Sequence, residues 1–433
     1  MKVLGIDIGT TSICAVLVNS ENGEIIKSVT KQNNSFIKTD NSFERIQDTA
    51  IIMNTVYSLL DEIGTDADAI GFSGQMHGIV YTDENGNAVS PLYTWQDERA
   101  AKEYENGKTY AQTIGCFSGY GLATDFYNEK NSLVPESAKY LCTVADYAAM
   151  QLCKTTKPIV HITNAASLGC FDLKEYKFII DNPRLPEVTC EFKAVGDYNG
   201  KPVCVALGDN QASFIGSVSG ENDALINVGT GAQISWLTEN STACEGVEIR
   251  PFDGQKYLAA GCSLCGGRAY AMFEKFIREA AELATGEKIL SVYSQLDKLL
   301  SEKTESELKA DCRFCGTRND PSVRGGIYNI SENNFTVADM AFSVLEGISK
   351  ELFDMYSLAS ADASGLVCSG NGTRKNPALR RIISKMFDKQ IKIPFYEEEA
   401  AYGAALASLV ACGECENIRS ACSKIRYRYG GEK

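Results

Sequence analysis

The chain contains two copies of one strand–turn–strand pattern, and this internal duplication constrains its fold more than any other feature. Residues 3–18 read VLGIDIGTTSICAVLV, and residues 224–237 read ALINVGTGAQISWL. When the copies are laid over each other, residues 7–11 (DIGTT) match residues 227–231 (NVGTG). Each copy has a Gly-Thr turn between two apolar runs, which predicts two strands joined by a tight turn. The repeat predicts two related domains that divide near residue 218, namely residues 1–217 and 218–433.

The elements around the two copies are those of an α/β protein. A chain of 433 residues exceeds the roughly 250 to 300 residues that one hydrophobic core usually serves, which agrees with two domains. The first copy opens a run of three short strands over residues 2–30, and a glycine-rich segment near the end links a strand to a helix that Asn376 caps and Pro377 begins. Apolar spacing predicts helices over residues 43–63, 137–152, 266–283, 289–300 and 336–358.

Composition excludes several classes of partner. The 42 basic and 56 acidic residues give a net charge of −14, which repels nucleic acids and anionic membranes from any generic surface. The N-terminus, MKVLGIDIGTTS, lacks the apolar core of a secretion signal, and no uninterrupted apolar run approaches the roughly 18 to 20 residues of a membrane span. We therefore expect a soluble cytoplasmic protein that binds neither nucleic acid nor membranes.

The sixteen cysteines are expected to be thiols, because a reducing cytoplasm does not maintain disulfides. They include three C-x-x-C pairs, at residues 262/265, 312/315 and 412/415. The gap between the first two pairs is much longer than the roughly 15 to 20 residues of a zinc ribbon, and no histidine lies near any pair. The spacing therefore does not favour a zinc site.

The two Gly-Thr turns are suited to hold phosphate. Glycine lets a phosphate approach successive backbone N–H groups, and threonine hydroxyls add further donors. Two such turns facing each other would grip a polyphosphate from both sides. Asp7 in the first copy corresponds to the neutral Asn227 in the second, so Asp7 is the candidate for a nucleotide-bound Mg²⁺ ion, while a second acid would repel the phosphates. The alternative for Asp7 is a turn aspartate that caps local amides.

Asp209 stands where a strand ends and a helix of small residues begins. The N-terminus of a helix favours an anion, so we expect an ionised carboxylate that can accept a proton from a substrate hydroxyl. Phosphoryl transfer depends mainly on alignment and charge stabilisation, so a modest base suffices. The alternative is that Asp209 serves only to cap the helix.

His77 is one of only two histidines in the chain, and it lies in the segment GFSGQMHGIV over residues 71–80. A neutral imidazole both donates and accepts hydrogen bonds, which suits recognition of a polyol, and the flanking glycines are expected to press the loop against a sugar. His161, the other histidine, is expected to be structural. The glycines of CSGNGTRKNP, residues 368–377, leave room for a base or a ribose, although a plain glycine turn is the alternative.

Six segments resemble, in their order, the motifs of the FGGY family of carbohydrate kinases. They are GIDIGTTS (5–12), SGQMHG (73–78), TWQDERA (94–100), GDNQASFIG (208–216), NVGTGAQIS (227–235) and CSGNGTRKNPAL (368–379). Within the family, SGQMHG and TWQDERA look most like sedoheptulokinase, followed by xylulokinase. The resemblance covers nearly the whole chain.

The resemblance implies two ribonuclease-H-like, actin-like α/β domains with ATP-Mg²⁺ and sugar in the cleft between them. It assigns Asp209 as the catalytic base and as a substrate contact, and Asp7 to the metal. The residues implied for the sugar are Gln75, Met76, His77, Asp97 and Arg99. Those implied for ATP are Thr10, Thr11, Ser12, Gly229, Thr230, Gly231, Gly370, Gly372, Thr373 and Asn376.

We therefore expect an ATP-dependent kinase that phosphorylates a terminal primary hydroxyl of a ketose, with sedoheptulose as the first candidate. D-xylulose or another ketose or polyol is the alternative within this chemistry. A nucleotide-dependent sugar sensor without turnover is the alternative of another class, and the presence of both Asp7 and Asp209 argues against it. The sequence leaves the oligomeric state open, a homodimer included.

Overall fold

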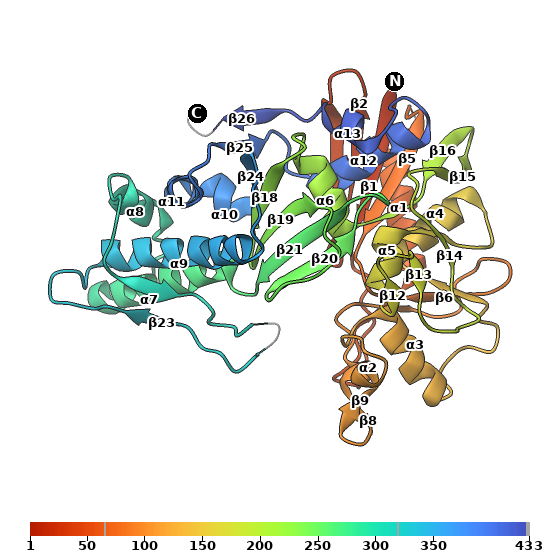
Figure 1. Ribbon diagram of the computed structural model, residues 1–433, viewed down its shortest axis with the longest axis horizontal. Helices are drawn as coiled ribbons and strands as arrows, with labels where there is room; N and C mark the ends of the chain where they lie inside the picture. Colours follow the sequence, from red (N-terminus) through yellow and green to blue (C-terminus); the bar gives the residue numbers. More distant parts are fainter. Residues whose placement is uncertain (65, 318–319, 430–433) are drawn as a thin grey trace.

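The computed structural model describes residues 1–64, 66–317 and 320–429, and two seven-stranded sheets form its framework (Figure 1). The strands of the first sheet run in the order β15-β16-β5-β1-β2-β3, and β17 pairs with β5 as well. Their bounds are β1 (Lys2–Ile8), β2 (Ser12–Asn19), β3 (Ile25–Gln32), β5 (Ala69–Gly74), β15 (Ala194–Tyr198), β16 (Lys201–Cys204) and β17 (Leu207–Gly208).

The second sheet is built from the second half of the chain, in the order β20-β21-β19-β18-β24-β25-β26. Its strands are β18 (Asp223–Val228), β19 (Ala232–Thr238), β20 (Val247–Pro251), β21 (Tyr257–Ser263), β24 (Gly365–Ser369), β25 (Ile391–Pro394) and β26 (Tyr427–Tyr429). Both sheets have an antiparallel hairpin, β1-β2 or β18-β19, whose first strand also pairs in parallel with a later strand. The predicted duplication of the strand–turn–strand unit is therefore present in the fold.

Helices cover both faces of each sheet, and one set of helices lies between the sheets. The first sheet packs on its outer face against α1 (Thr49–Ile63) and α4 (Val144–Cys153). The second packs on its outer face against α7 (Gly266–Thr285), α8 (Tyr293–Leu300), α9 (Val337–Leu358) and α11 (Pro377–Phe387). A third core between the sheets contains α6 (Asp209–Ser217), α12 (Glu399–Ala411) and α13 (Ile418–Cys422). This is the two-domain α/β arrangement that the sequence predicts.

Glycines allow α12 to lie directly on the first sheet and on α6. A Cβ at Gly5 or Gly71 would collide with the backbone of Ala401 or Ala404 in α12, and one at Gly216 or Gly403 would collide at the α6–α12 crossing. Backbone contact this close is available only to glycine. The helix α12 is thus fixed against strands from the opposite end of the sequence.

The shorter elements lie mainly in an extension of the first half, around the helices α2 and α3 in Figure 1. Its helices are α2 (Tyr110–Thr113), α3 (Gly121–Lys130), α5 (Ile162–Ser167) and the 3₁₀ turn at Arg99–Ala101. Its strands are β4 (Ile46–Gln47), β6 (Val80–Thr82), β7 (Leu92–Tyr93), β8 (Glu103–Glu105), β9 (Lys108–Thr109), β10 (Tyr140–Cys142), β11 (Ile159–His161), β12 (Phe171–Asp172), β13 (Lys177–Phe178) and β14 (Glu187–Thr189). The second half adds β22 (Lys309–Asp311), β23 (Gly326–Tyr328) and α10 (Gly370–Lys375).

The structure corrects several predicted helix bounds. The helix expected over residues 43–63 begins only at Thr49, because Asp48 caps its first amides and residues 46–47 pair as a strand. The helix expected over 137–152 begins at Val144, after the strand β10. The glycine-rich loop expected after residue 369 is instead the short helix α10, which Gly370 enters with a φ of +81°. The predicted cap at Asn376 and the proline at the first helical position are confirmed.

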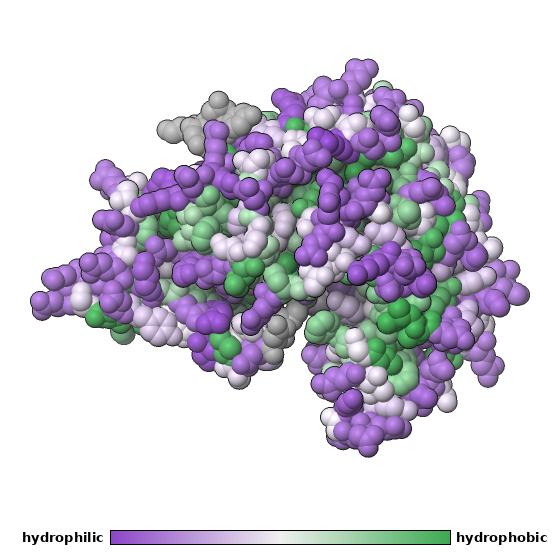
Figure 2. Space-filling model, in the orientation of Figure 1, coloured by the Kyte–Doolittle hydropathy of each residue, from purple (hydrophilic) through white to green (hydrophobic). Residues whose placement is uncertain are grey.

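The described residues include no helix that is long and apolar enough to cross a membrane. Figure 2 shows a largely polar surface that is hollowed between the two lobes at its lower edge.

Candidate active site

Three strands of the first sheet end side by side and bring the candidate residues together. Asp7 in β1 is in register with Ser73 in β5, and Gly74 in β5 is in register with Gly208 in β17. Asp209 follows Gly208 as the first residue of α6. Because these strands are parallel, their carboxyl ends meet at one edge, where α/β proteins usually place ligands.

The first Gly-Thr turn, residues 9–11, is held by polar contacts to its carbonyl oxygens. Asn33 donates from its side-chain amide to Gly9 (2.9 Å) and from its backbone to Thr11 (2.8 Å), and Gln47 donates to Thr10 (2.9 Å). Within the described residues, no protein group accepts a hydrogen bond from the backbone amides of this turn. The turn therefore presents its N–H groups to a ligand, as an anion site requires.

The second Gly-Thr turn, residues 229–231, is held by hydrogen bonds from the start of a helix to its carbonyl oxygens. The backbone amides of Gly267 and Arg268, at the start of α7, donate to the carbonyl oxygens of Gly229 (2.9 Å) and Thr230 (3.0 Å). No protein acceptor for the amides of residues 229–231 occurs in the described part of the chain. Gly266 and Gly267 touch the turn so closely that a Cβ on either would collide with it. The contact of this glycine pair with the turn was not predicted from the sequence.

Burial raises the proton affinity of both acidic candidates. Burial is the main cause that raises the pKa of Asp209 to about 7, and the charge of Asp7 adds to the shift, while Arg250 opposes it. Burial likewise raises the pKa of Asp7 to about 6, although Ser73 donates a hydrogen bond to its carboxylate (2.8 Å), and Glu398 adds a repulsive charge. Desolvation thus opposes the ionisation of Asp209 that the helix start favours, and the expectation of an ionised carboxylate stays a prediction.

Two buried amide oxygens next to Asp209 lack a hydrogen-bond partner among the described residues, namely Oδ1 of Asn210 and Oε1 of Gln211. Asn210 donates to Gln233 of β19 (3.1 Å), and Gln211 donates to the carbonyl oxygen of Pro251 in β20 (3.0 Å). Asn210 lines a cavity of about 360 Å³ beside the second turn, and Gln211 lines one of about 310 Å³ that contains His77. Unsatisfied buried oxygens indicate positions that a ligand or water completes.

The second of these spaces, the His77 cavity, lies between the two halves of the chain. It is lined by Met76, His77 and Tyr120 from the first half and by Glu248 and Arg250 from the second. Arg250 donates to Glu248 (2.7 Å), which places a charged pair opposite the histidine. A mainly apolar cavity with a few donors and acceptors from both halves suits a ligand whose hydroxyls those groups can orient.

His77 is held in an unusual conformation. Its φ of +73° lies in the left-handed region, which is uncommon for a residue with a side chain and often marks a functional position. Its Nδ1 lies 2.8 Å from the carbonyl oxygen of Ser167, so Nδ1 carries the proton, and its ring stacks on Tyr120 at 4.4 Å. That the flanking glycines press the loop against a sugar stays a prediction. A Cβ at Gly78 would collide with Tyr93, so that glycine serves internal packing.

The neighbouring sugar candidates, Gln75 and Met76, connect His77 to the rest of the site. Gln75 donates to Gln47 (2.8 Å) and accepts from Thr10 (3.4 Å), and Met76 packs on Gly208, directly before Asp209. His161 is buried, with a pKa lowered by burial to about 4, and it caps α5. Its position agrees with the structural role that the sequence predicts.

Asp97 and Arg99 pair with each other in the interior. The Arg99 Nε lies 2.6 Å from Asp97 Oδ1, and the two residues are 3% and 0% exposed, respectively. Arg99 also donates to Asn128 (2.8 Å), and the backbone amide of Arg45 donates to Asp97 (3.1 Å). Protein partners thus use these charged groups. The contact with sugar that was expected of both residues stays a prediction.

The residues expected at the adenosine pocket surround the start of α10 and α11. Gly370 and Gly372 pack on Val228, next to the second turn, where a Cβ on either would be too close. Thr373 is buried and donates to the carbonyl oxygen of Ser369 (2.6 Å), and Asn376 caps α11 by accepting from Leu379 (2.8 Å). The segment therefore lies beside the second turn, and two of its polar side chains bond to protein backbone.

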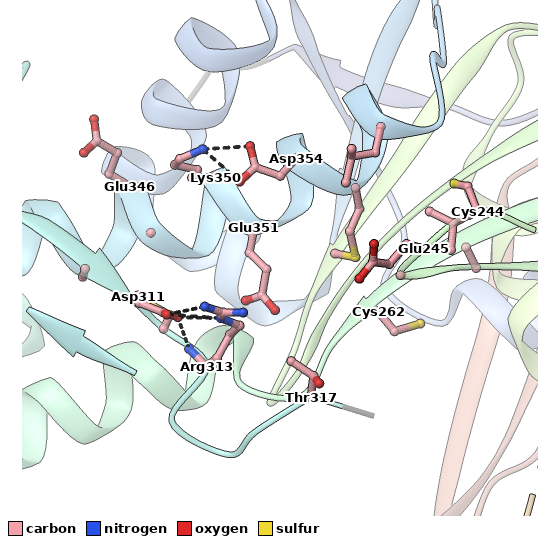
Figure 3. Close-up of a pocket in the computed structure, with 18 of the residues that line it drawn as sticks. Cys244, Glu245, Cys262, Asp311, Arg313, Thr317, Glu346, Lys350, Glu351 and Asp354 are labelled. Carbon is pink, nitrogen blue, oxygen red and sulfur yellow. Dashed lines mark hydrogen bonds and ion pairs between the residues drawn. The ribbon is translucent and has the colours of Figure 1, made fainter. Parts of the chain in front are cut away.

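A larger cavity of about 690 Å³ lies behind the second turn, between α9, the β20-β21 hairpin and residues 309–317 (Figure 3). Its charged side chains pair internally, Arg313 with Asp311 (2.6 Å) and Lys350 with Asp354 (2.8 Å). Glu351 accepts from Ser263 (2.8 Å), whose backbone adjoins Gly231. One wall of this cavity is therefore bonded to the strand end that lies against the second turn.

Comparison with known proteins places this site in a family. The N-terminal domain of the FGGY family of carbohydrate kinases matches residues 2–181, and the C-terminal domain of that family matches residues 224–412. The chain belongs to the FGGY family of carbohydrate kinases. The fold, the family and the general chemistry of an ATP-dependent carbohydrate kinase are thereby confirmed.

Relatives that are named for different sugars have similar sequence identity to the chain. Sedoheptulokinase of Mus musculus is 26% identical, with 94% of this chain and 97% of the relative covered. Xylulose kinase of Staphylococcus xylosus is also 26% identical, with 95% and 91% covered. Among solved structures, the gluconate kinase of Lactobacillus acidophilus superposes with a TM-score of 0.83 at 20% identity, covering 99% of this chain and 92% of that chain. The structural likeness establishes the shared FGGY fold.

Proposed function

We propose that the chain transfers the γ-phosphoryl group of ATP to a terminal primary hydroxyl of a ketose, with Asp209 as the catalytic base. The observation that carries the proposal is the position of Asp209. It follows the end of β17, which pairs with β5, the strand that also pairs with the Asp7 strand β1. Its neighbours Asn210 and Gln211 line the space beside the second turn and the His77 cavity, respectively. A hydroxyl held beside His77 would then lie between the base and a phosphate held by the turns.

The mechanism we infer is direct in-line transfer. Asp209 orients the hydroxyl and takes its proton as the oxygen attacks, and the amides of both Gly-Thr turns stabilise the charge on the moving phosphoryl group. A carboxylate with a pKa near 7 is a stronger base than an ordinary aspartate, and it is still substantially ionised at neutral pH. In this proposal Thr10, Thr11, Ser12, Gly229, Thr230 and Gly231 hold the phosphates, while Gly370, Gly372, Thr373 and Asn376 border the adenosine.

The acidic residues fit a divalent cation. Asp7 and Asp209 are partly buried carboxylates that repel each other, a combination that bound Mg²⁺ stabilises. The described residues contain no group of three metal-ligating side chains, which agrees with an ion that mainly binds phosphates and water. We propose that Asp7 holds this Mg²⁺, which when bound neutralises charge on the nucleotide.

Residues of the first half of the chain are proposed to bind the sugar. Gln75, Met76 and His77 would contact the sugar, and so would Asp97 and Arg99, which were expected there as well. The buried Asp97–Arg99 pair would also position the segment 94–100, whose Trp95 donates to Thr10 (3.1 Å).

We also propose that the boundary between the two domains lies between residues 217 and 218. The helix α12 of the second domain packs on the sheet of the first.

Sedoheptulose is the proposed acceptor, and its 7-hydroxyl the proposed site of transfer. The support is the 26% identity with a sedoheptulokinase over 94% of the chain. D-xylulose is the second candidate, because a xylulose kinase has the same 26% identity to the chain. The test is ADP release at saturating ATP-Mg²⁺ across sedoheptulose, D-xylulose, gluconate and glycerol. The highest kcat/KM is expected for sedoheptulose; a higher value for another sugar would refute this acceptor, and ADP release that no sugar stimulates would refute the acceptor class as a whole.

A further inference from the structure

Two cysteines meet at the edge of the His77 cavity, and the proposed mechanism uses neither. The sulfur atoms of Cys116 and Cys170 are 3.3 Å apart, and both residues line the cavity together with His77 and Tyr120. A disulfide has an S–S distance of about 2.05 Å, so the sulfurs need to approach by little more than about 1 Å to bond.

The surroundings favour this approach. Gly115 and Gly169, each directly before one of the cysteines, have φ values of +71° and +95°, and Gly115 has open space around it. Cys170 also donates to the carbonyl oxygen of Ile114 (3.3 Å), so the two thiols form a short hydrogen-bonded chain. The hydrogen bond from Cys116 lowers the pKa of Cys170 and raises that of Cys116, so Cys170 is the thiol that ionises first.

We propose that Cys116 and Cys170 form an oxidation-sensitive dithiol, a modification site at which a peroxide forms a reversible disulfide that impairs the acceptor site. The Cys170 thiolate attacks one oxygen of hydrogen peroxide, which breaks the O–O bond, forms a sulfenic acid and releases hydroxide. Cys116 loses its proton to that hydroxide, and its sulfur attacks Cys170 and expels a second hydroxide, which a proton from solvent converts to water. In total, two thiols and one peroxide give one disulfide and two water molecules.

The disulfide would disturb the residues that hold His77. Gly169 lies against both Cys116 and Tyr120, and Tyr120 stacks on the His77 ring at 4.4 Å. Drawing the sulfurs together therefore shifts the ring on which His77 rests. This consequence rests on the proposed function, whereas formation of the disulfide does not.

The experiment treats the full chain with hydrogen peroxide and maps disulfides by mass spectrometry of unreduced peptides. We expect a loss of two hydrogen atoms per chain, a Cys116–Cys170 linked peptide, and reversal by dithiothreitol. Cys116→Ser and Cys170→Ser should each abolish that peptide. Cys190→Ser is the matched control, because Cys190 is exposed and distant in sequence, and it should leave the disulfide unchanged.

Sugar-dependent ADP release is then measured, each variant being compared with its own reduced form. Oxidation should lower kcat/KM for the sugar at least tenfold in the wild type and in Cys190→Ser, change the affinity for ATP less than twofold, and have little effect on the two serine variants at positions 116 and 170. A disulfide that maps elsewhere, for instance to Cys265 and Cys315, which also lie within hydrogen-bonding reach, would overturn the proposal. So would a mapped Cys116–Cys170 disulfide without loss of sugar use in an enzyme that is otherwise active.

Discussion

Asp7 and Asn227 occupy the same place in the two copies of the fold, and each bonds to a serine on the neighbouring parallel strand. Asp7 accepts from Ser73 (2.8 Å), its register partner in β5, and Asn227 donates to Ser369 (2.9 Å), its register partner in β24. The two copies thus share their geometry, but the first has a carboxylate where the second has a neutral amide. This asymmetry gives the site one negative charge for a cation without placing a second beside the phosphates.

Asp7→Asn should therefore raise the Mg²⁺ concentration needed for half-maximal rate at least tenfold and lower the rate at saturation. It should also move the acid limb of the pH–rate profile to lower pH, because the charge of Asp7 raises the pKa of Asp209. Magnesium titrations at several pH values check both effects. An unchanged titration together with an unchanged pH profile would remove Asp7 from the metal site.

Asn227→Asp places a second carboxylate beside the second turn and should raise the KM for ATP about tenfold or more, with a smaller effect on the KM for sugar. Steady-state kinetics with ATP varied at saturating sugar measure the effect. Asn227→Ser is the control, since it loses the amide but adds no charge. If both variants behave alike, the effect comes from the lost bond to Ser369, contrary to the electrostatic argument.

His77→Asn should lower kcat/KM for the sugar about 10- to 100-fold, because a buried hydroxyl that loses its hydrogen-bond partner costs about 1 to 3 kcal/mol. Asparagine tolerates the left-handed backbone better than alanine, so the change tests the imidazole with little added strain. The affinity for ATP, measured by calorimetry, should stay within twofold. Equal losses for ATP and sugar would indicate a general distortion of the cleft.

Arg99→Met should mainly lower the stability of the fold, because it leaves the Asp97 carboxylate buried without its ion-pair partner. Breaking a buried ion pair in this way costs about 3 to 5 kcal/mol, so the free energy of unfolding should fall by that order. Denaturant unfolding monitored by circular dichroism measures it. If stability stays near that of the wild type and only sugar use is lost, Arg99 contacts the sugar and does not position the segment.

The sequence predicts the architecture well, because the duplicated Gly-Thr hairpins are a local pattern that both sheets repeat. Asp7, His77 and Asp209 could also be found, since each lies in or shortly after a recognisable strand. Other features depend on long-range contacts. Asn33 and Gln47 hold the first turn from distant segments, and nothing in their local sequence indicates it.

The same limit applies to the surroundings of the charged residues. The helix start at Asp209 predicts an ionised carboxylate, but the sequence does not reveal that burial and Asp7 together raise its pKa to about 7. The segment TWQDERA places Asp97 two residues before Arg99, and only the fold shows that the two bond to each other in the interior. The contact between α7 and the second Gly-Thr turn does have a local signal, namely the glycine pair Gly266–Gly267 at the start of a predicted helix.

The pKa of Asp209 also predicts a dependence of stability on pH. Its value is raised from 3.8 to about 7 in the folded state, so ionisation disfavours folding progressively as the pH rises from about 4 to 7. Asp209→Asn removes this penalty and should stabilise the fold by about 2 kcal/mol at pH 8, with a smaller gain at pH 5, since partial exposure reduces the full value. Thermal unfolding at both pH values tests this. A gain that does not change with pH would contradict the raised pKa.

The most direct test of the account is sugar-dependent ADP release by Asp209→Asn, with binding of ATP and sugar measured by calorimetry on the same preparation. If Asp209 is the base that takes the proton of the attacking hydroxyl, both ligands should bind within about threefold of the wild type while turnover falls by two or more powers of ten. Normal binding with turnover equal to that of the wild type would show that Asp209 only begins the helix α6, and would contradict the mechanism.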